Sequence, residues 1–161
     1  MKVPFELQHE LRTLAARYAS AADHKDRETF ARCFVPDGVV SVVRKPGAEP
    51  VVRQGYDELL TVFNTLDPFI RTYHHLGQSL YRYETDESTD VVLGEVYCVA
   101  HHVPEGEPLT DNTYYIRYED RYVRAGEVWR FARRDLHQDF KSVTSGVHDV
   151  HMVTPSTTVW A

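Results

Sequence analysis

Residues 72–103 have the sequence TYHHLGQSLYRYETDESTDVVLGEVYCVAHHV, which carries the main information on the fold. Its two ends are rich in β-branched and aromatic residues, and a polar, acidic segment separates them, a pattern typical of two strands joined by a turn. Each of the two runs carries a histidine pair, His74-His75 in the first and His101-His102 in the second. Because successive side chains of a strand point to opposite faces, one histidine of each pair must face inward.

Two more strands are expected after this pair, so the second half of the chain predicts a meander. The four strands are expected at about residues 72–84, 91–103, 112–123 and 128–140, with turn-forming residues between them. Before the meander, the pattern predicts a strand over 39–44, a short return strand over 51–53 and a helix over 55–66.

The N-terminal part of the chain predicts two helices. Apolar residues recur at helical spacing between residues 4 and 22: Leu7, Leu11, Leu14, Tyr18 and Ala22. Asp26 is expected to cap a second, short helix, and Pro36-Asp37-Gly38 is expected to end it as a turn.

Helices first and antiparallel strands last make an α+β layout. A strongly curved antiparallel sheet wrapped by the N-terminal helices would leave a central cavity between them. We expect one domain over residues 1–140, because a chain of 161 residues is long enough for one hydrophobic core. Residues 141–161 have no periodicity and are expected to form a tail that is a lid, a subunit-contacting arm or disordered.

Composition excludes several classes of function. The formal net charge of −6 argues against nucleic-acid binding, which favours a basic patch. No apolar run is long enough to span a membrane, and the polar residues 1–10 do not form a signal peptide, so a cytoplasmic protein is expected. The cysteines, Cys33 and Cys98, have no CxxC partner, which predicts free thiols and no zinc site of the cysteine type.

Alternation along the strands favours His74 and His102 as the inward histidines. His74 is expected to share a face with Leu76, Gln78 and Leu80, and His102 with Val96, Cys98 and Ala100. A β-bulge would reverse the second assignment and turn His101 inward.

Tyr18 and Asp23 complete the set of candidate proton-transfer residues. A carboxylate beside an imidazole can orient it and stabilise its charged form. The alternative for Asp23 is a helix-end residue, and for Tyr18 a core residue with a satisfied hydroxyl. A metal site would need Asp23, His74 and His102 together, but the short ligand spacing of known metal motifs is missing, so no metal is expected.

Four motifs resemble the SnoaL-like branch of the NTF2-like superfamily: YASAADHKD (18–26), TYHHLGQ (72–78), GEVYCVAHH (94–102), and YEDRY (118–122) with WRFARR (129–134). Members of this branch include scytalone dehydratase, bile acid 7α-dehydratase and polyketide cyclases. The resemblance implies a cone-shaped α+β fold, an active site without a cofactor and a homodimer or homotrimer. It also implies an acid/base pair of Asp23 and His74, joined by Tyr18.

The resemblance places the second histidine of scytalone dehydratase at His101 or His102, and an arginine of varied role at Arg134. From these inferences we expect a lyase (dehydratase) or isomerase/cyclase that acts on a small apolar, carbonyl-bearing or polycyclic molecule. His74 would remove a proton, Tyr18 would donate to an oxyanion, and His102 would help a hydroxyl leave as water. Residues expected to contact the substrate are His101, Arg134, Gln78 and Cys98.

Two other functions remain open on the sequence alone. One is a small-molecule-binding protein without chemistry, and the other is an assembly partner similar to the small subunit of a ring-hydroxylating dioxygenase. Fold by itself does not separate them, because one fold hosts many functions.

Overall fold

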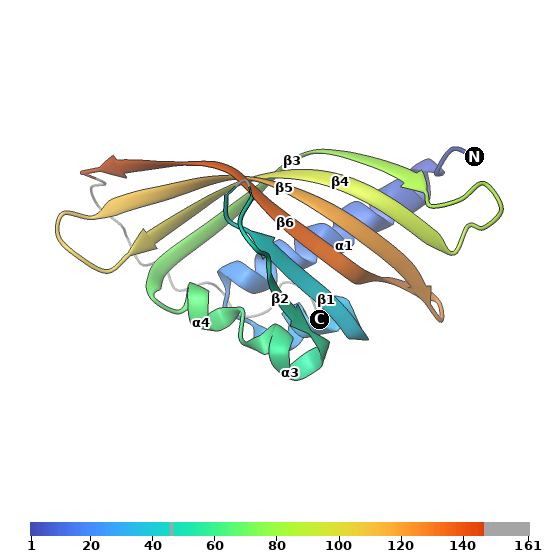
Figure 1. The fold of residues 1–161 in the computed structure, drawn as a ribbon, viewed down its shortest axis with the longest axis horizontal. Coiled ribbons are helices and arrows are strands. Elements are labelled where there is room, and N and C mark those ends of the chain that lie inside the picture. Colours follow the sequence, from blue (N-terminus) through green and yellow to red (C-terminus); the bar gives the residue numbers. More distant parts are fainter. Residues whose placement is uncertain (46, 147–161) are drawn as a thin grey trace.

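A curved six-stranded sheet forms one layer of the structure, and α1 lies along one side of it (Figure 1). The computed structural model describes residues 1–45 and 47–146. In chain order the elements are α1 (Phe5–Asp23), α2 (Arg27–Arg32), β1 (Phe34–Val43), β2 (Val51–Gln54), α3 (Gly55–Leu60), α4 (Phe63–Leu66), β3 (Phe69–Tyr83), β4 (Val91–Pro104), β5 (Thr110–Ala125) and β6 (Val128–Ser145). The predicted α+β class and the order of its elements are therefore confirmed.

The sheet order is β2-β1-β6-β5-β4-β3, so β3 to β6 form the expected antiparallel meander. One pair departs from the purely antiparallel sheet that was expected, because β1 runs parallel to β6. No hairpin joins these two strands: α3, α4 and the rest of the meander lie between them in the chain. Their relative direction was therefore free of the constraint that a tight turn imposes.

Local boundaries differ from the sequence-based prediction at three places. Pro36-Asp37-Gly38 is not a turn but an irregular part of β1, where pairing with β6 shifts between Phe34 and Val39. The helix expected over 55–66 is broken at residues 61–62 into α3 and α4. Strand β6 continues past Phe140 to Ser145, because backbone pairing with the start of β5 needs no apolar periodicity. Of the tail expected over residues 141–161, residues 141–145 therefore belong to β6, and residues 147–161 lie outside the described part.

A bulge in β3 reverses which side chains face the helices. Leu76 pairs with Cys98 but Ser79 pairs with Val96, so an extra residue sits in β3 at this point. Gln78 and Leu80 are exposed as a result. The prediction that they share the inner face of His74 is therefore wrong, since simple alternation assumed an unbroken ladder.

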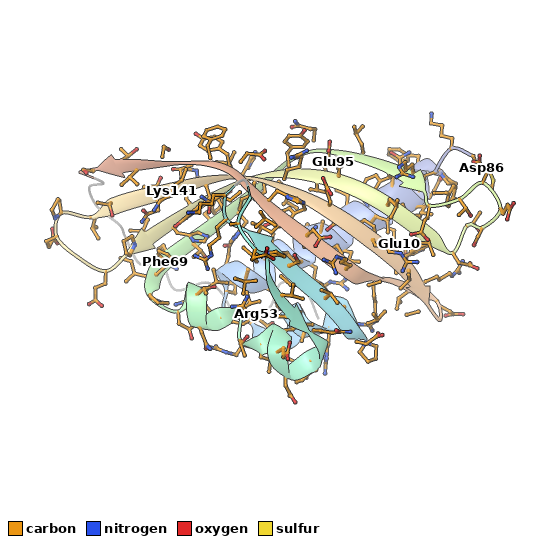
Figure 2. The ribbon with its side chains drawn as sticks, viewed as in Figure 1. Glu10, Arg53, Phe69, Asp86, Glu95 and Lys141 are labelled. Atoms are coloured by element: carbon orange, nitrogen blue, oxygen red, sulfur yellow. The ribbon has the colours of Figure 1, made fainter. Side chains whose placement is uncertain are left out.

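The inner face of the sheet packs on an apolar stripe of α1 that includes Leu11, Leu14 and Tyr18. Asp26 caps α2 as predicted, and its side chain accepts a hydrogen bond from the backbone N–H of Thr29 at 3.0 Å. Side chains on the other face, such as Glu95 of β4, point away from the helices (Figure 2). Across residues 1–45 and 47–146, none of the helices is long and apolar enough to cross a membrane.

Candidate active site

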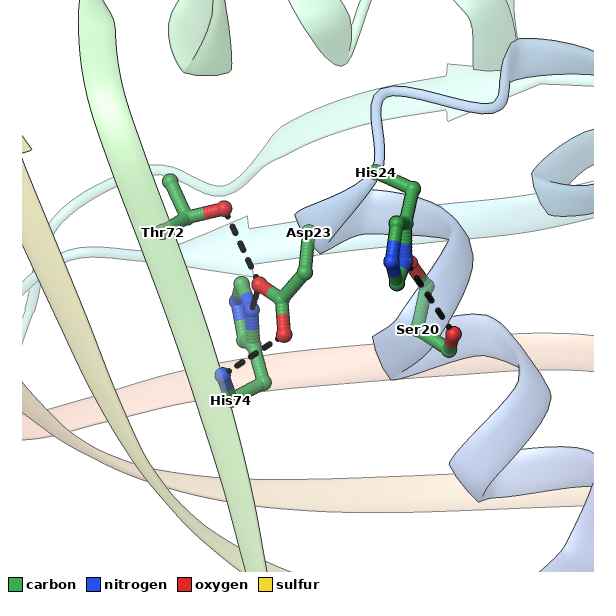
Figure 3. A network of polar contacts seen from close by, with 5 residues as sticks. All are labelled: Ser20, Asp23, His24, Thr72 and His74. Atoms are coloured by element: carbon green, nitrogen blue, oxygen red, sulfur yellow. Dashed lines mark hydrogen bonds and ion pairs between the residues drawn. The ribbon is translucent and has the colours of Figure 1, made fainter. Parts of the chain in front are cut away.

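The C-terminal end of α1 lies against β3 and brings Asp23 to His74 (Figure 3). Oδ1 of Asp23 accepts hydrogen bonds from Oγ1 of Thr72 at 2.9 Å and from the ring of His74, whose Nδ1 lies 2.6 Å away. Oδ2 accepts a third from the backbone N–H of His74 at 3.0 Å. The carboxylate is therefore held at both oxygens by the same short segment of β3.

Sequence explains how the two elements approach so closely. Ala21 and Ala22 are buried in the last turn of α1, and their small side chains leave room for the strand. Thr72 and His74 are two residues apart in β3, so both side chains point from one face toward the helix end. The side chains of Asp23 and His74 are only 17% and 7% exposed, respectively.

The environment of Asp23 keeps it ionised. Burial by itself raises the pKa of a carboxyl group, but the hydrogen bonds and charge of His74 and the hydroxyl of Thr72 outweigh burial and lower the pKa of Asp23 below its ordinary value. An ionised carboxylate can only accept hydrogen bonds, so Nδ1 of His74 carries the proton between them. The lone pair of the ring is then on Nε2, the nitrogen available to accept a proton.

His102 of β4 lies beside this pair. It is opposite Thr72 in the ladder, and its ring centroid is 5.4 Å from that of His74. The alternation of side chains along this strand predicts that His102 faces inward. Rings of Phe69 and Tyr114 flank His102 at 4.7 and 4.9 Å, and Phe69 marks the start of β3 in Figure 2.

Burial, together with the charge of His74, lowers the pKa of His102 to about 4. His102 is therefore neutral at pH 7. Its Nε2 is buried and has no hydrogen-bond partner in the part of the chain that the structure describes. A buried polar atom without a partner beside a histidine base is a group that could hydrogen-bond a ligand.

The structure separates His101 from this cluster. Its Nδ1 lies 2.6 Å from Oδ2 of Asp111, and Thr113 donates to the same oxygen at 3.1 Å. The ring is 41% exposed, on the opposite face of β4 from His102. His101 therefore does not join His74, and neither does Gln78, which the bulge turns outward.

Tyr18, Cys98 and Arg134 form a second cluster in the core. Nε and Nη2 of Arg134 each donate to Asp120 at 2.7 Å, and both side chains have no exposed area. The guanidinium lies 4.4 Å from the ring centroid of Tyr18 and 4.1 Å from that of Tyr118. These contacts are those of a buried ion pair stacked between aromatic rings. Nη1 of Arg134 is buried and has no hydrogen-bond partner among the described residues.

Burial also raises the pKa of Tyr18 and of Cys98 to about 12 each. Both groups are therefore protonated at neutral pH, and the thiol of Cys98 is not a nucleophile. The ring of Tyr18 packs on Phe30 at 4.6 Å, in agreement with the alternative that assigned Tyr18 to the core.

Sequence reasoning missed Thr72 and Asp120. Thr72 was detectable, since it lies two residues before His74 and must share its face. Asp120 was not, because its role depends on the register that places it opposite Arg134. Within residues 1–45 and 47–146, no group of three or more His, Cys, Asp or Glu side chains is arranged to hold a metal ion.

Comparison with known proteins adds a family and a fold. The family model described as a SnoaL-like domain matches residues 4–135. A proposed scytalone dehydratase from Novosphingobium aromaticivorans has a similar structure, with a TM-score of 0.70 and 21% identity over 84% of this chain and 85% of the other. The hexachlorocyclohexane dehydrochlorinase LinA-type3 from Novosphingobium barchaimii gives a TM-score of 0.73 and 16% identity over 91% and 95%. Comparison with curated proteins found no significant match.

Proposed function

The chain belongs to the SnoaL-like domain family, and from this membership we propose that it is a cofactor-independent acid/base enzyme, a lyase or an isomerase, with His74 as its general base. The fold is compatible with cofactor-free catalysis or with ligand binding, and the arrangement at Asp23 favours catalysis. The observation that carries the proposal is the 2.6 Å contact between Nδ1 of His74 and Oδ1 of Asp23 in a largely buried setting. A carboxylate so placed fixes the tautomer of the base and stabilises its protonated form.

In the proposed reaction, Nε2 of His74 takes a proton from a carbon next to an electron-withdrawing group of the substrate. The electron pair of the broken C–H bond forms a double bond, and the leaving group departs from the neighbouring carbon. A leaving hydroxyl takes up the proton that His74 had accepted and departs as water. In an isomerase, His74 would return the proton to another carbon of the same molecule.

His102 has a revised part in this proposal. Because its pKa is about 4, His102 is neutral at pH 7, and we therefore do not assign it as the general acid. A neutral imidazole N–H can still donate a hydrogen bond to an oxygen on which charge develops. Tyr18 has no part, because its contacts are with Phe30 and Arg134.

The substrate class that we propose is a small, largely apolar molecule with a carbonyl group or fused rings. Aromatic rings on both sides of His102 support it, because they offer an apolar wall next to a hydrogen-bonding group. The names of two structural relatives, a proposed scytalone dehydratase and a hexachlorocyclohexane dehydrochlorinase, both denote an elimination, of water in the first and of hydrogen chloride in the second.

Proton abstraction can be tested with scytalone, hexachlorocyclohexane and a panel of β-hydroxy ketones in D₂O. NMR follows both elimination and hydrogen–deuterium exchange at the acidic carbon, so that proton removal is detected even without product. We expect His74→Gln and Asp23→Asn to slow the reaction by about 10²–10⁴-fold, the usual contribution of a general base. His75→Gln is the matched control, since His75 is exposed on the other face of β3 and should react as the unmodified protein does.

Near-full rates in both His74→Gln and Asp23→Asn would rule out the proposed site. Saturable binding of a panel compound with no exchange and no product would favour the second function, ligand binding without chemistry. Co-purification with a larger catalytic subunit would favour the assembly-partner function.

A further inference from the structure

A pocket lies away from the Asp23–His74 pair. It has a volume of about 400 Å³ and lies among α2, β1, α3 and the hairpin that joins β5 to β6. It has no lining residue in common with the cluster of Asp23, His74 and His102. Its size is within the range of about 300–1,000 Å³ that is usual for small-molecule sites.

The floor of this pocket is apolar. The apolar residues that line the pocket are Ala31, Phe34, Val35, Pro36, Leu59 and Ala125, and Pro36 among them is exposed. Phe34 and Leu59 are also members of the main hydrophobic core, with exposed fractions of 3% and 1%. The floor therefore keeps its shape without a ligand, and an apolar group that covers it would leave water at no cost in reorganisation.

Both charged residues that line the pocket are cations, Arg32 and Arg130. Arg32 already pairs with Glu28 on the surface. Nη1 of Arg130 donates a hydrogen bond to the carbonyl oxygen of Arg32, the last residue of α2. The guanidinium of Arg130 therefore lies at the C-terminal, negative end of this helix. In the described part of the chain, no carboxylate lies within ion-pair distance of the Arg130 guanidinium.

A cation beside an apolar floor favours one class of ligand. A guanidinium that loses water against an apolar group needs a hydrogen-bond acceptor or a counter-charge in its place, and an anion supplies both. A planar carboxylate matches its remaining N–H donors in geometry and in charge. Tyr56, which lines the pocket and is half-exposed, carries a hydroxyl that is one more donor.

We propose that this pocket is a second binding site, which takes a small monocarboxylate with an apolar body. The carboxylate pairs with Arg130, and the apolar body covers Phe34 and Leu59. A dianion such as inorganic phosphate fits less well. It has no apolar surface to cover the floor, and Arg130 can balance only one of its two negative charges. This site does not depend on the acid/base chemistry proposed above.

The test uses sodium octanoate as the probe and octanamide as its uncharged counterpart. The ¹⁵N-labelled full-length protein is titrated with each, and NMR shift changes give both the affinity and the place of binding. We expect shifts around Phe34, Tyr56 and Arg130, and octanoate binding at least about tenfold tighter than that of octanamide, a factor that one charge-assisted hydrogen bond can supply.

Two variants remove the charge preference in different ways. Arg130→Gln removes the cation, and Tyr56→Glu places a negative charge at the rim on a residue that is 50% exposed, where folding is not at risk. Each should weaken octanoate binding at least about tenfold and change octanamide binding much less, because only octanoate carries a charge. Arg124→Gln is the matched control: it loses the same charge from the same hairpin but does not line the pocket.

Other results would overturn the proposal. Equal affinity for octanoate and octanamide would show that no anion is recognised. Shifts centred on Thr72 and His74 would place the carboxylate at the first site instead. Absence of binding at millimolar octanoate would mean that the pocket takes no small carboxylate. Self-association of the protein that Tyr56→Glu abolishes would mean that this surface is covered by a second copy of the chain.

Discussion

At the scale of single residues, His102 shows how the surroundings of a side chain decide its protonation. His74 and His102 have the same chemistry and adjacent rings, yet only His74 has a carboxylate bonded to Nδ1. His102 has no such carboxylate contact, so burial, together with the charge of His74, lowers its pKa to about 4. A histidine pair in a sequence therefore says where an imidazole will be but not which charge it will carry.

The lowered pKa of His102 makes stability depend on pH. Between about pH 6.5 and pH 4 the unfolded chain binds a proton at His102 and the folded chain does not, so stability is lost as pH falls through this window. The free energy of unfolding of the unmodified protein should fall when the pH is lowered from 7 to 5. In His102→Phe, whose side chain cannot be protonated, we expect this fall to be smaller by about 2 kcal/mol. Urea denaturation at the two pH values measures the difference.

His75→Phe is the control for this experiment, because His75 is exposed and its replacement should leave the acid sensitivity in place. At pH 7, His102→Phe should cost little, since Nε2 of His102 has no partner to lose among the described residues. An unchanged slope between pH 7 and pH 5 in His102→Phe would contradict the assignment.

At the scale of the strand, β3 and β4 are shaped by two glycines with different surroundings. Gly77 sits at the bulge, where an added Cβ would lie 3.6 Å from Tyr97, an ordinary contact. Gly94 has less room: an added Cβ would lie 2.8 Å from a ring atom of Tyr122 and 3.0 Å from one of Tyr81. Tyr122 cannot move aside easily, because it is fully buried and its hydroxyl donates to Asp120.

We therefore expect opposite results from the same change at the two glycines. Gly94→Ala should lower the free energy of unfolding by about 1–3 kcal/mol, the usual cost of overpacking. Gly77→Ala should be neutral or slightly stabilising, because it reduces the freedom of the unfolded chain without a clash. Urea denaturation of both variants decides, and equal losses would show that Tyr122 and Tyr81 do not limit the space at Gly94.

At the scale of the whole molecule, the ion pair of Arg134 and Asp120 joins the helix layer to the sheet. Asp120 and Arg134 are cross-strand partners in β5 and β6, and the guanidinium stacks on Tyr18 of α1. The pair has no exposed area, so each charge depends on the other for compensation. Such a pair has a structural role, because two of the three guanidinium nitrogens of Arg134 are used to hold Asp120.

Breaking this pair should be costly. We expect Asp120→Asn to lower the free energy of unfolding by about 3–5 kcal/mol, because it leaves Arg134 buried without a counter-charge. The double variant Asp120→Asn with Arg134→Met removes both charges and should recover much of that loss. Denaturation of the single and double variants measures the coupling, and losses that simply add would contradict it. Glu84→Gln, at an exposed pair with Arg121, is the control and should change stability little.

Much of the fold followed from the sequence. Helical spacing of Leu11, Leu14 and Tyr18 predicted α1, and period-2 runs predicted the strands of the meander, because both depend on neighbours in the chain. Residues two apart in one strand, such as Thr72 and His74, had to share a face for the same reason. The parallel pairing of β1 with β6 did not follow, since no local turn sets it.

Local sequence patterns are sufficient to place an Asp at the end of the first helix and a His in a central strand. Their contact depends on tertiary packing, because the packing of α1 on β3 sets the 2.6 Å distance between Nδ1 of His74 and Oδ1 of Asp23. The tertiary structure also decided that Gln78 turns outward at a bulge and that Arg134 is paired with Asp120. Such outcomes depend on register and on long-range packing, which act between segments that local sequence patterns treat as separate.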